Sequence, residues 1–512
     1  MTKPAPPKTV LVVGAGVGGV ALAARLATAG LSVRVVEKND FTGGRCSTRT
    51  TADGFRFDQG PSLLLLPQIF RNTYNDLGTS LEDEGITLVK CNPNYRVVFG
   101  DGETVTMSTD MAQMKVQVEK YEGEKGFEGF LGFMQEAHRH YELSLTHVLN
   151  VNFTSLLSML RPAFLSHLHQ LHPFESVYTE LAEGIWYPLG GFAKIIEGLV
   201  GIAKRNDVEF LLSSSVKQVL LDPTGKKAIG VILESGEKLS ADIVVINADL
   251  VWSLNNIFPP TPRAKRLAEK PVSCSSISFY WSMDRNIPSL GSHTIFLADE
   301  YKESFDSIFK EHTIPNEPSF YVNVPTRVDP TASPEGKDSV VILVPVGHLS
   351  DVLPTSADWD VVVAKARQHV FDTLSSRLGL HDFPSWITEE SMHTPISWRD
   401  SFNLHRGSIL GLSHSFFNVL SFRPATRHPT ISQTYFVGAS THPGTGVPIC
   451  LSGAAITSEQ ILDDLGIPAP WKVSKHKNGE VKTLDRVHKS SNVKVVLLAM
   501  ILSLSLTLFL RR

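Results

Sequence analysis

The sequence predicts a two-part α/β protein, in which a nucleotide-binding domain is interleaved with an α+β domain. A strand and a glycine-rich turn open the chain, and a second strand and glycine-rich turn follow only near residue 440. Strand-like runs lie between them, together with one clear helix over Trp359–Leu378. The chain has 512 residues, which is too long for one simple domain and sufficient for two with a large core.

The opening segment has the order of a dinucleotide-binding unit. A β-branched run, Val10–Val13, precedes GAGVGG, a helix-like segment over Val20–Thr28 and a second strand over Leu31–Val36. Glycines permit the tight turn and let the backbone approach a pyrophosphate at the positive end of the helix. Glu37 lies 18 residues past Gly19, the distance expected for an acid that binds a ribose. The candidates in this Rossmann-like unit are Gly14, Ala15, Gly16, Gly18, Gly19, Glu37 and Lys38.

Two later turns indicate which dinucleotide binds. The segments NDFTGGRCS (39–47) and GFRFDQGPS (54–62) resemble flavoproteins of the amine-oxidase and phytoene-desaturase superfamily. The resemblance implies an FAD cofactor, with the first turn at the flavin diphosphate and the second near the isoalloxazine ring. An arginine there would neutralise phosphate charge, and glycines would allow close approach. The candidates are Gly43, Gly44, Arg45, Gly60, Pro61 and Ser62, with Val216 in the strand-like run 208–221.

The segment TYFVGASTHPGTGVPICLSG (434–453) is similar to the closing flavin motif of the same superfamily. It predicts a strand, a glycine-rich turn and a helix that begins near Gly453. The positive end of that helix would stabilise negative charge on a reduced flavin. We therefore expect the two ends of the chain to form one FAD site, with Gly438, Gly446, Val447 and Pro448 as further candidates.

Over nearly its whole length the chain resembles the carotenoid desaturases, most closely the fungal phytoene desaturases. Supporting stretches include ELAEGIWYPLGGF (180–192) and SFNLHRGSILGLSHSFFNVLSFRP (401–424). The resemblance implies that bound FAD accepts a hydride from an apolar C40 carotenoid precursor, phytoene or a near relative, and adds a double bond. The aromatic runs at 186–187, 279–281 and 416–417 would line an apolar tunnel or pack in the core.

One departure from the family keeps alternatives open. Ser176 is followed almost directly by Glu180, where the family normally has a further segment of the substrate domain. No catalytic acid or base is therefore assigned. The alternatives are a carotenoid isomerase, a retinoid saturase, an amine oxidase, or a flavoprotein that binds a polyene without turnover. Quinone, oxygen and NAD(P) remain candidate electron acceptors, and the oligomeric state is unknown.

The predicted domains are discontinuous. The FAD-binding domain comprises 8–75, 190–270 and 425–468, and the substrate-binding domain comprises 76–189 and 271–424. The net charge of −4 gives no field that favours nucleic acid. Four scattered cysteines, Cys46, Cys91, Cys274 and Cys450, indicate neither a disulfide framework nor a metal site.

The C-terminal residues predict a membrane anchor. A basic linker over 469–494 leads to an uncharged apolar run over 495–510, which is followed by Arg511 and Arg512. Sixteen residues span about 24 Å as a helix, slightly less than a hydrocarbon core, and the flanking cations can snorkel. A buried core helix is the alternative. We expect a single C-terminal transmembrane helix in contact with membrane lipid of an endomembrane, with the catalytic body in the cytosol.

Overall fold

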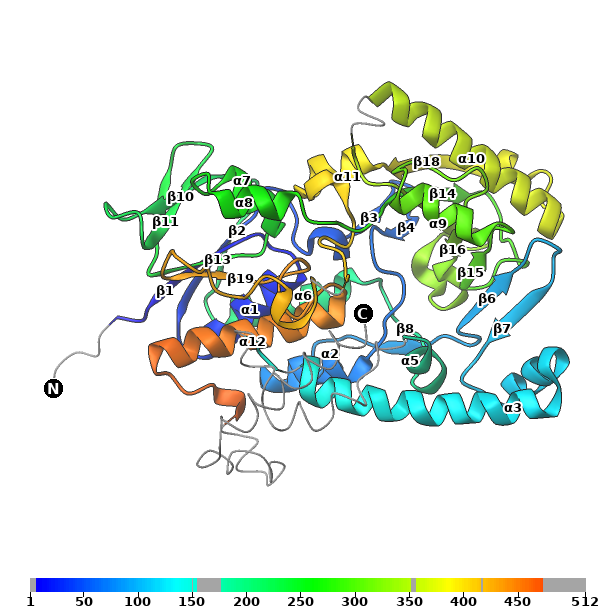
Figure 1. Ribbon diagram of the computed structural model, residues 1–512, viewed down its shortest axis with the longest axis horizontal. Helices are drawn as coiled ribbons and strands as arrows, with labels where there is room; N and C mark the ends of the chain where they lie inside the picture. The colour runs from blue at the N-terminus through cyan, green and yellow to red at the C-terminus, as the bar shows by residue number, and fades with distance from the viewer. Residues whose placement is uncertain (1–5, 150, 154–175, 351–355, 416–417, 473–512) are drawn as a thin grey trace, which may run out of the picture. The chain divides into compact units, whose positions relative to one another are not determined.

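The computed structural model describes residues 6–149, 151–153, 176–350, 356–415 and 418–472 (Figure 1). Residues 1–467 form one compact unit. Its helices are α1 (Val17–Thr28), α2 (Pro67–Asp76), α3 (Met111–Ser144), α5 (Ser176–Ala182), α6 (Ala193–Arg205), α7 (Leu250–Asn256), α8 (Pro262–Ala268), α9 (Tyr301–Phe309), α10 (Ser356–Leu378), α11 (Pro395–Phe402) and α12 (Val447–Leu465).

In the described part of the chain, nineteen strands form five sheets. The strands are β1 (Thr9–Val13), β2 (Ser32–Val36), β3 (Thr48–Thr50), β4 (Arg56–Asp58), β5 (Leu88–Lys90), β6 (Tyr95–Val98), β7 (Thr104–Met107), β8 (Trp186–Pro188), β9 (Glu209–Leu211), β10 (Val216–Leu221), β11 (Ala228–Leu233), β12 (Lys238–Ser240), β13 (Ile243–Ile246), β14 (Ser275–Met283), β15 (His293–Phe296), β16 (Phe320–Asn323), β17 (Ser339–Val346), β18 (Ile387–His393) and β19 (Thr434–Phe436).

A five-stranded parallel sheet joins the two ends of the chain. Its order is β19-β13-β1-β2-β9, with Val10 paired to Ile243 and to Val33. The strands β1 and β13 are apolar and buried, as expected where helices cover both faces of a parallel sheet. Helix α12, drawn in orange, packs against α1 (Figure 1). The carboxyl ends of β1, β2, β13 and β19 therefore meet at one edge.

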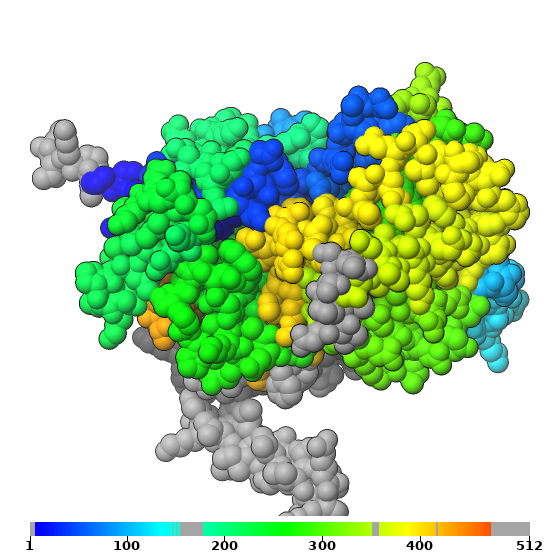
Figure 2. Space-filling view, turned by 90° about the horizontal axis from the view of Figure 1, so that it is seen from above, coloured from blue at the N-terminus to red at the C-terminus, as the bar shows by residue number. Residues whose placement is uncertain are grey.

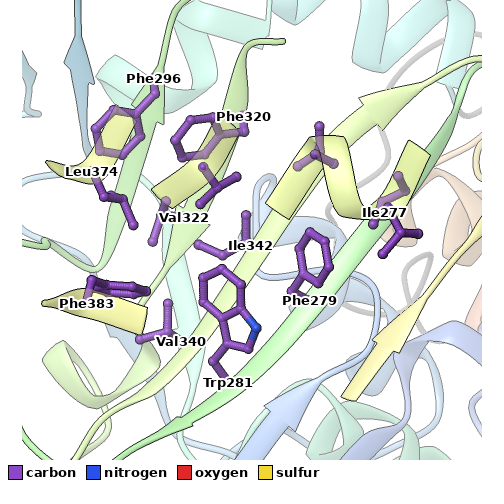
Figure 3. Close-up of a cluster of buried hydrophobic side chains, with 14 of the residues drawn as sticks. Ile277, Phe279, Trp281, Phe296, Phe320, Val322, Val340, Ile342, Leu374 and Phe383 are labelled. Atoms are coloured by element: carbon purple, nitrogen blue, oxygen red, sulfur yellow. The ribbon is translucent and has the colours of Figure 1, made fainter. Parts of the chain in front are cut away.

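The second large sheet has seven strands in the order β18-β14-β17-β16-β15-β6-β7. Only β15 and β6 pair in parallel among its neighbours. One face packs against α10 around a core that includes Phe279, Trp281, Phe320, Ile342 and Leu374 (Figure 3). Alternation along β14 turns Ile277, Phe279 and Trp281 toward this core, so Ser276, Ser278 and Tyr280 face the opposite side.

The two large sheets draw their strands from different segments of the chain. The strands of the parallel sheet lie within 9–36, 209–246 and 434–436, and those of the seven-stranded sheet lie within 95–107 and 275–393. The division into two domains, with its boundaries, stays a prediction. Two helices begin earlier than expected, α1 at Val17 rather than Val20 and α12 at Val447 rather than near Gly453. Both helices start directly from a glycine N-cap, Gly16 or Gly446, and in α1 the first turn also contains Gly18 and Gly19.

The structure overturns the predicted localisation. Within the described ranges, no helix has both the length and the apolar character needed to cross a membrane. The longest helix in these ranges, α3, has 34 residues, is broken at Gly123 (φ +71°) and carries Lys and Glu along its length, whereas a spanning helix needs about 20 mainly apolar residues. The predicted single-pass location, with its catalytic body in the cytosol, is therefore wrong by this finding. The segment 495–510 lies outside the described residues.

The core of the seven-stranded sheet gives a stability prediction. Phe320 is 2% exposed and stacks on Phe296 with ring centroids 4.7 Å apart. Phe320→Ala should lower the free energy of unfolding by about 3–5 kcal/mol, through lost burial and the cavity left behind. Urea unfolding followed by tryptophan fluorescence measures it. Phe309→Ala, at a site 48% exposed, is the matched control, and an equal loss in both variants would contradict the core assignment.

Candidate functional site

The turn between β1 and α1 leaves the start of the helix open to a ligand. Gly14 has φ +100°, and its N–H donates to the Val36 carbonyl at 2.8 Å, which ties the turn to β2. Gly16 is the N-cap of α1, and no side chain caps the helix. The first N–H groups of a helix lack partners within it, so they and the helix dipole favour an anion at this end.

The side chain of Asn247 lies against this turn and requires its glycines. Asn247 follows β13, and its amide Nδ2 donates to the Gly14 carbonyl at 3.2 Å. A Cβ on Gly16 would lie 2.8 Å from Asn247 Nδ2, and one on Gly18 would lie 2.9 Å from Asn247 Oδ1. A Cβ on Gly19 would lie 2.3 Å from the Gly14 carbonyl oxygen. Sequence reasoning missed Asn247, although its place after the strand-like run IVVI was visible.

Glu37 lies at the end of β2 with its carboxylate held in one orientation. Its Oε2 accepts the Ala15 N–H at 2.8 Å and its Oε1 accepts the Asn39 N–H at 2.9 Å. The side chain is 7% exposed. Each oxygen keeps a further lone pair, so the carboxylate can still accept hydroxyl hydrogens from a ribose.

The neighbouring Lys38 is held by helix α11. Its Nζ donates to the Asp400 carbonyl at 2.6 Å and to Asn403 Oδ1 at 3.1 Å. Burial lowers the pKa of Lys38, while the nearby Glu37 and Asp400 carboxylates oppose that shift. Lys38 therefore joins the parallel sheet to the segment that precedes residue 404.

The Gly-Gly-Arg turn places a half-buried cation, Arg45, beside the first turn. Gly43 has φ +97°, and its N–H donates to the Ala15 carbonyl at 2.8 Å. The guanidinium of Arg45 donates to the Ile409 carbonyl, and burial lowers its pKa. A Cβ on Gly60 would lie 2.6 Å from the Arg45 carbonyl oxygen. The two predicted turns thus pack directly on each other.

The closing motif completes the same site. The Val437 N–H donates to the Ile246 carbonyl at 3.0 Å, which continues β19 beside β13. Gly438 has φ +122°, and Gly446, with φ +102°, is the N-cap of α12. Pro448 lies in the first turn of α12, where the missing N–H of proline costs no helical hydrogen bond.

The side chain of Arg423 holds the closing turn in place through hydrogen bonds to backbone carbonyls. It is 3% exposed, and its Nε donates to the Thr441 carbonyl at 3.1 Å and its Nη1 to the Asn418 carbonyl at 2.9 Å. Its Nη2 also donates to the carbonyl of Ala439. Burial lowers the pKa of Arg423 to about 10. Sequence reasoning did not single it out, since an arginine within LSFRP has no local signature of burial.

These segments enclose one cavity of about 530 Å³. Figure 2 views a face on which the blue N-terminal segment, the green segment around residues 215–270 and the yellow segment around residue 400 meet. The predicted residues that line the cavity are Gly14, Gly16, Gly18, Glu37, Lys38, Gly43, Gly44, Arg45, Gly60, Pro61, Val216, Gly438, Gly446 and Val447.

Four predicted residues do not line the cavity. Ala15 and Gly19 lie beneath the turn, where Ala15 bonds Glu37 and Gly43 through its backbone. Ser62 turns away from the cavity, and its hydroxyl lies 2.8 Å from that of Tyr321. Pro448 is in the first turn of α12.

The cavity wall opposite the nucleotide motifs is largely apolar. It includes two serines from β14, Ser276 and Ser278, and the apolar side chains Leu343, Trp398, Phe402, Leu404, Ile409 and Leu410. Two side chains proposed for a tunnel, Phe279 and Trp281, pack instead in the core of the seven-stranded sheet. Tyr187 is buried and donates to Asp58 at 2.6 Å. The run at 416–417 lies outside the described residues.

The donor set fits a dinucleotide with a flat apolar ring. The open helix end and Arg45 suit a diphosphate, Glu37 suits a ribose, and the glycines leave room that a Cβ would fill. The cavity volume lies within the usual range for organic cofactors and ligands, about 300–1,000 Å³. The wall formed by Leu343 and Trp398 suits an uncharged ring.

Comparisons with known proteins identify relatives of this chain. The model for flavin containing amine oxidoreductases matches residues 17–462. A phytoene desaturase of Fusarium fujikuroi is 50% identical, with 94% of this chain and 95% of that protein covered. A phytoene desaturase of Neurospora crassa is 48% identical, with 96% and 90% covered. A zeta-carotene-forming phytoene desaturase of Myxococcus xanthus is 36% identical, with 89% and 94% covered.

Solved structures show the same fold at low identity. An oxidoreductase from Methanosarcina mazei has a TM-score of 0.58 at 16% identity and covers 88% of this chain and 100% of its own. A putrescine oxidase bound to putrescine has a TM-score of 0.56 at 15% identity, with 89% and 99% covered. At these identities the likeness concerns the fold alone.

The contact between Gly19 and Gly14 gives a prediction for cofactor binding. Gly19→Ala should separate α1 from the turn and yield protein with little bound flavin, because the new Cβ meets backbone that cannot yield. The flavin-to-protein absorbance ratio after purification measures this. Gly201→Ala, in α6, meets only ordinary contacts and should keep its flavin. A Gly19→Ala protein with full flavin content would contradict the packing described here.

The two cysteines of the cavity wall should be unreactive in the folded protein. Burial raises the pKa of Cys46 to about 12 and that of Cys450 to about 11, from an ordinary 9.0. Both thiols are therefore protonated at pH 8 and poor nucleophiles. Iodoacetamide labelling followed by mass spectrometry should show neither alkylated, whereas both react in urea. Rapid labelling of either one in the native protein would contradict the burial.

Proposed function

The chain belongs to the flavin-containing amine oxidoreductases and, within them, to the phytoene desaturases, and we propose that it desaturates phytoene with FAD in carotenoid biosynthesis. It is accordingly an oxidoreductase that acts on CH–CH groups. The observation that carries the proposal is the single cavity formed by motifs from both ends of the chain. The identity of about one half to fungal phytoene desaturases extends over nearly the whole chain.

Different residues around the cavity would bind different parts of FAD. Glu37, fixed by two backbone N–H groups, would accept hydrogen bonds from the ribose. Gly16 and Gly18 would admit the diphosphate to the start of α1, with Arg45 opposite. Gly446 and Val447, at the start of α12, would lie at the ring. These assignments rest on the cavity lining and on the chemistry of each donor.

When bound, FAD supplies a two-electron acceptor for a hydride from one carbon while the adjacent carbon loses a proton. The protein's part is to hold the hydrocarbon chain beside the ring and to exclude water. Leu343, Leu404 and Leu410 offer no polar group to the substrate, which matches a ligand that has none. An apolar C40 substrate is insoluble in water, so its delivery from lipid is part of this proposal.

The alternatives from the sequence rank lower. The relatives above 30% identity described here are desaturases, whereas the likeness to putrescine oxidase lies at 15%. The match to the Fusarium protein runs over 542 positions, more than the 512 residues of this chain. The relatives thus carry residues without a counterpart here, and this keeps binding without turnover as the second candidate. Quinone, oxygen or NAD(P) would accept the electrons.

Anaerobic reduction of the bound flavin tests the proposal. Phytoene in detergent micelles should bleach the flavin absorbance of the holoprotein at about 450 nm. Extraction of the reaction mixture should then yield a pigment with additional conjugated double bonds. Squalene, an apolar hydrocarbon of similar type without the central conjugated triene, is the matched control. Bleaching by an amine but not by phytoene would contradict the proposal. Phytoene binding without bleaching would favour the second candidate.

A further inference from the structure

A second cavity, of about 660 Å³, lies between helix α8 and the segment 421–429. Helix α12 contributes Gln460 to its wall. The lining residues on α8 and directly after it are Arg263, Arg266, Leu267 and Lys270, which recur at the spacing of one helix face. The cavity is thus built from three separate segments of the chain and has no part in the proposed flavin chemistry.

Cations dominate the lining. Arg263, Arg266, Lys270, Arg423 and Arg427 all line the cavity, and none of its described lining residues is Asp or Glu. Arg427 forms an ion pair with Asp464. Arg263, Arg266 and Arg423 form no ion pair with any carboxylate in the described part of the chain. The cavity therefore holds an excess of positive charge.

Bringing these positive charges together costs free energy when no anion is bound among them. Arg423 is 3% exposed, and the partners described for it are backbone carbonyls, which satisfy its N–H groups without neutralising its charge. Burial lowers the pKa of Lys270, and Arg423 and Arg263 lower it further. Arg423 and Arg263 thus raise the cost of charging Lys270. A multivalent anion in the cavity would offset this repulsion.

We propose that this cavity binds a phosphate-bearing organic anion. Planar guanidinium groups match phosphate oxygens in pairs of hydrogen bonds. Neutral polar side chains, Ser421 and Thr426, lie on the wall opposite α8, beside the apolar Phe422 and Pro424. A phosphate group fits the charged part of the cavity, and the carbon skeleton that carries it fits the apolar part. The phosphate belongs either to a soluble compound or to a lipid headgroup.

Hydrogen bonds of Arg423 link the two cavities. Arg423 lines the second cavity, while the carbonyls that it bonds belong to Ala439 and Thr441, which line the first. Its replacement would therefore disturb the flavin site as well. The exposed Arg263 and Arg266 are the residues to change, because they lie on α8 away from the first cavity.

Calorimetric titration of the flavin-loaded protein with inorganic pyrophosphate at low salt tests the site. Saturable binding is expected, and Arg263→Gln and Arg266→Gln should each weaken it by about tenfold or more, because a charged hydrogen bond is lost. Lys265→Gln removes the same charge from α8 at a position outside the cavity lining and should change the affinity by no more than about twofold. The flavin absorbance of each protein, recorded before and after, verifies that FAD is retained.

Vesicles distinguish the two sources of phosphate. The protein is sedimented with phosphatidylcholine vesicles that contain or lack phosphatidic acid. Capture that depends on phosphatidic acid and falls with Arg263→Gln, but not with Lys265→Gln, assigns a lipid headgroup. Saturable pyrophosphate binding without such capture assigns a soluble phosphate compound. The proposal is overturned if neither probe binds, or if Lys265→Gln weakens binding as much as Arg263→Gln and Arg266→Gln.

Discussion

The close approach of α1 to the strands β1 and β13 is the constraint on which the first cavity depends. A Cβ on Gly19 would meet the Gly14 carbonyl, and Asn247 fills the space beneath the turn and bonds that carbonyl. With any side chain at Gly19, the helix would have to move outward, and a side chain at Gly16 would displace Asn247. Its open N-terminus would then no longer face the space enclosed by Glu37 and the closing turn. The position of an anion in this cavity is thus set by backbone packing.

The seven-stranded sheet forms one wall of the cavity. One face of the sheet packs in its own core, and residues of the other face line the cavity. On β14, Phe279 and Trp281 turn into the core against α10, and Ser276 and Ser278 turn toward the cavity. One strand therefore anchors its sheet and lines the site at once. Lys38 ties the two halves together, since it extends from β2 and bonds the end of α11.

Two arginines, Arg45 and Arg423, stabilise loops of the site by donating hydrogen bonds to backbone carbonyls. Arg45 donates to Ile409, and Arg423 donates to Ala439, Thr441 and Asn418. In each case the arginine holds a loop that lies outside the β-strands. Its N–H groups also provide partners for backbone carbonyls that would otherwise be buried without one. The charge remains available to an anion, which suits a diphosphate near Arg45 and a phosphate near Arg423.

The sequence by itself determined the local units: strand, glycine turn, helix and acid at 10–37, and strand, glycine turn and helix at 434–465. These follow from short-range periodicity and from turns that only glycine adopts easily. Only the tertiary structure decided that Asn247 and Arg423 support the site, that Ser62 turns toward Tyr321, and that Phe279 and Trp281 pack in the core. Each of these depends on partners far away in the chain, which no local pattern specifies. The predicted membrane location is wrong by the finding that no helix among the described residues is long and apolar enough to cross a membrane.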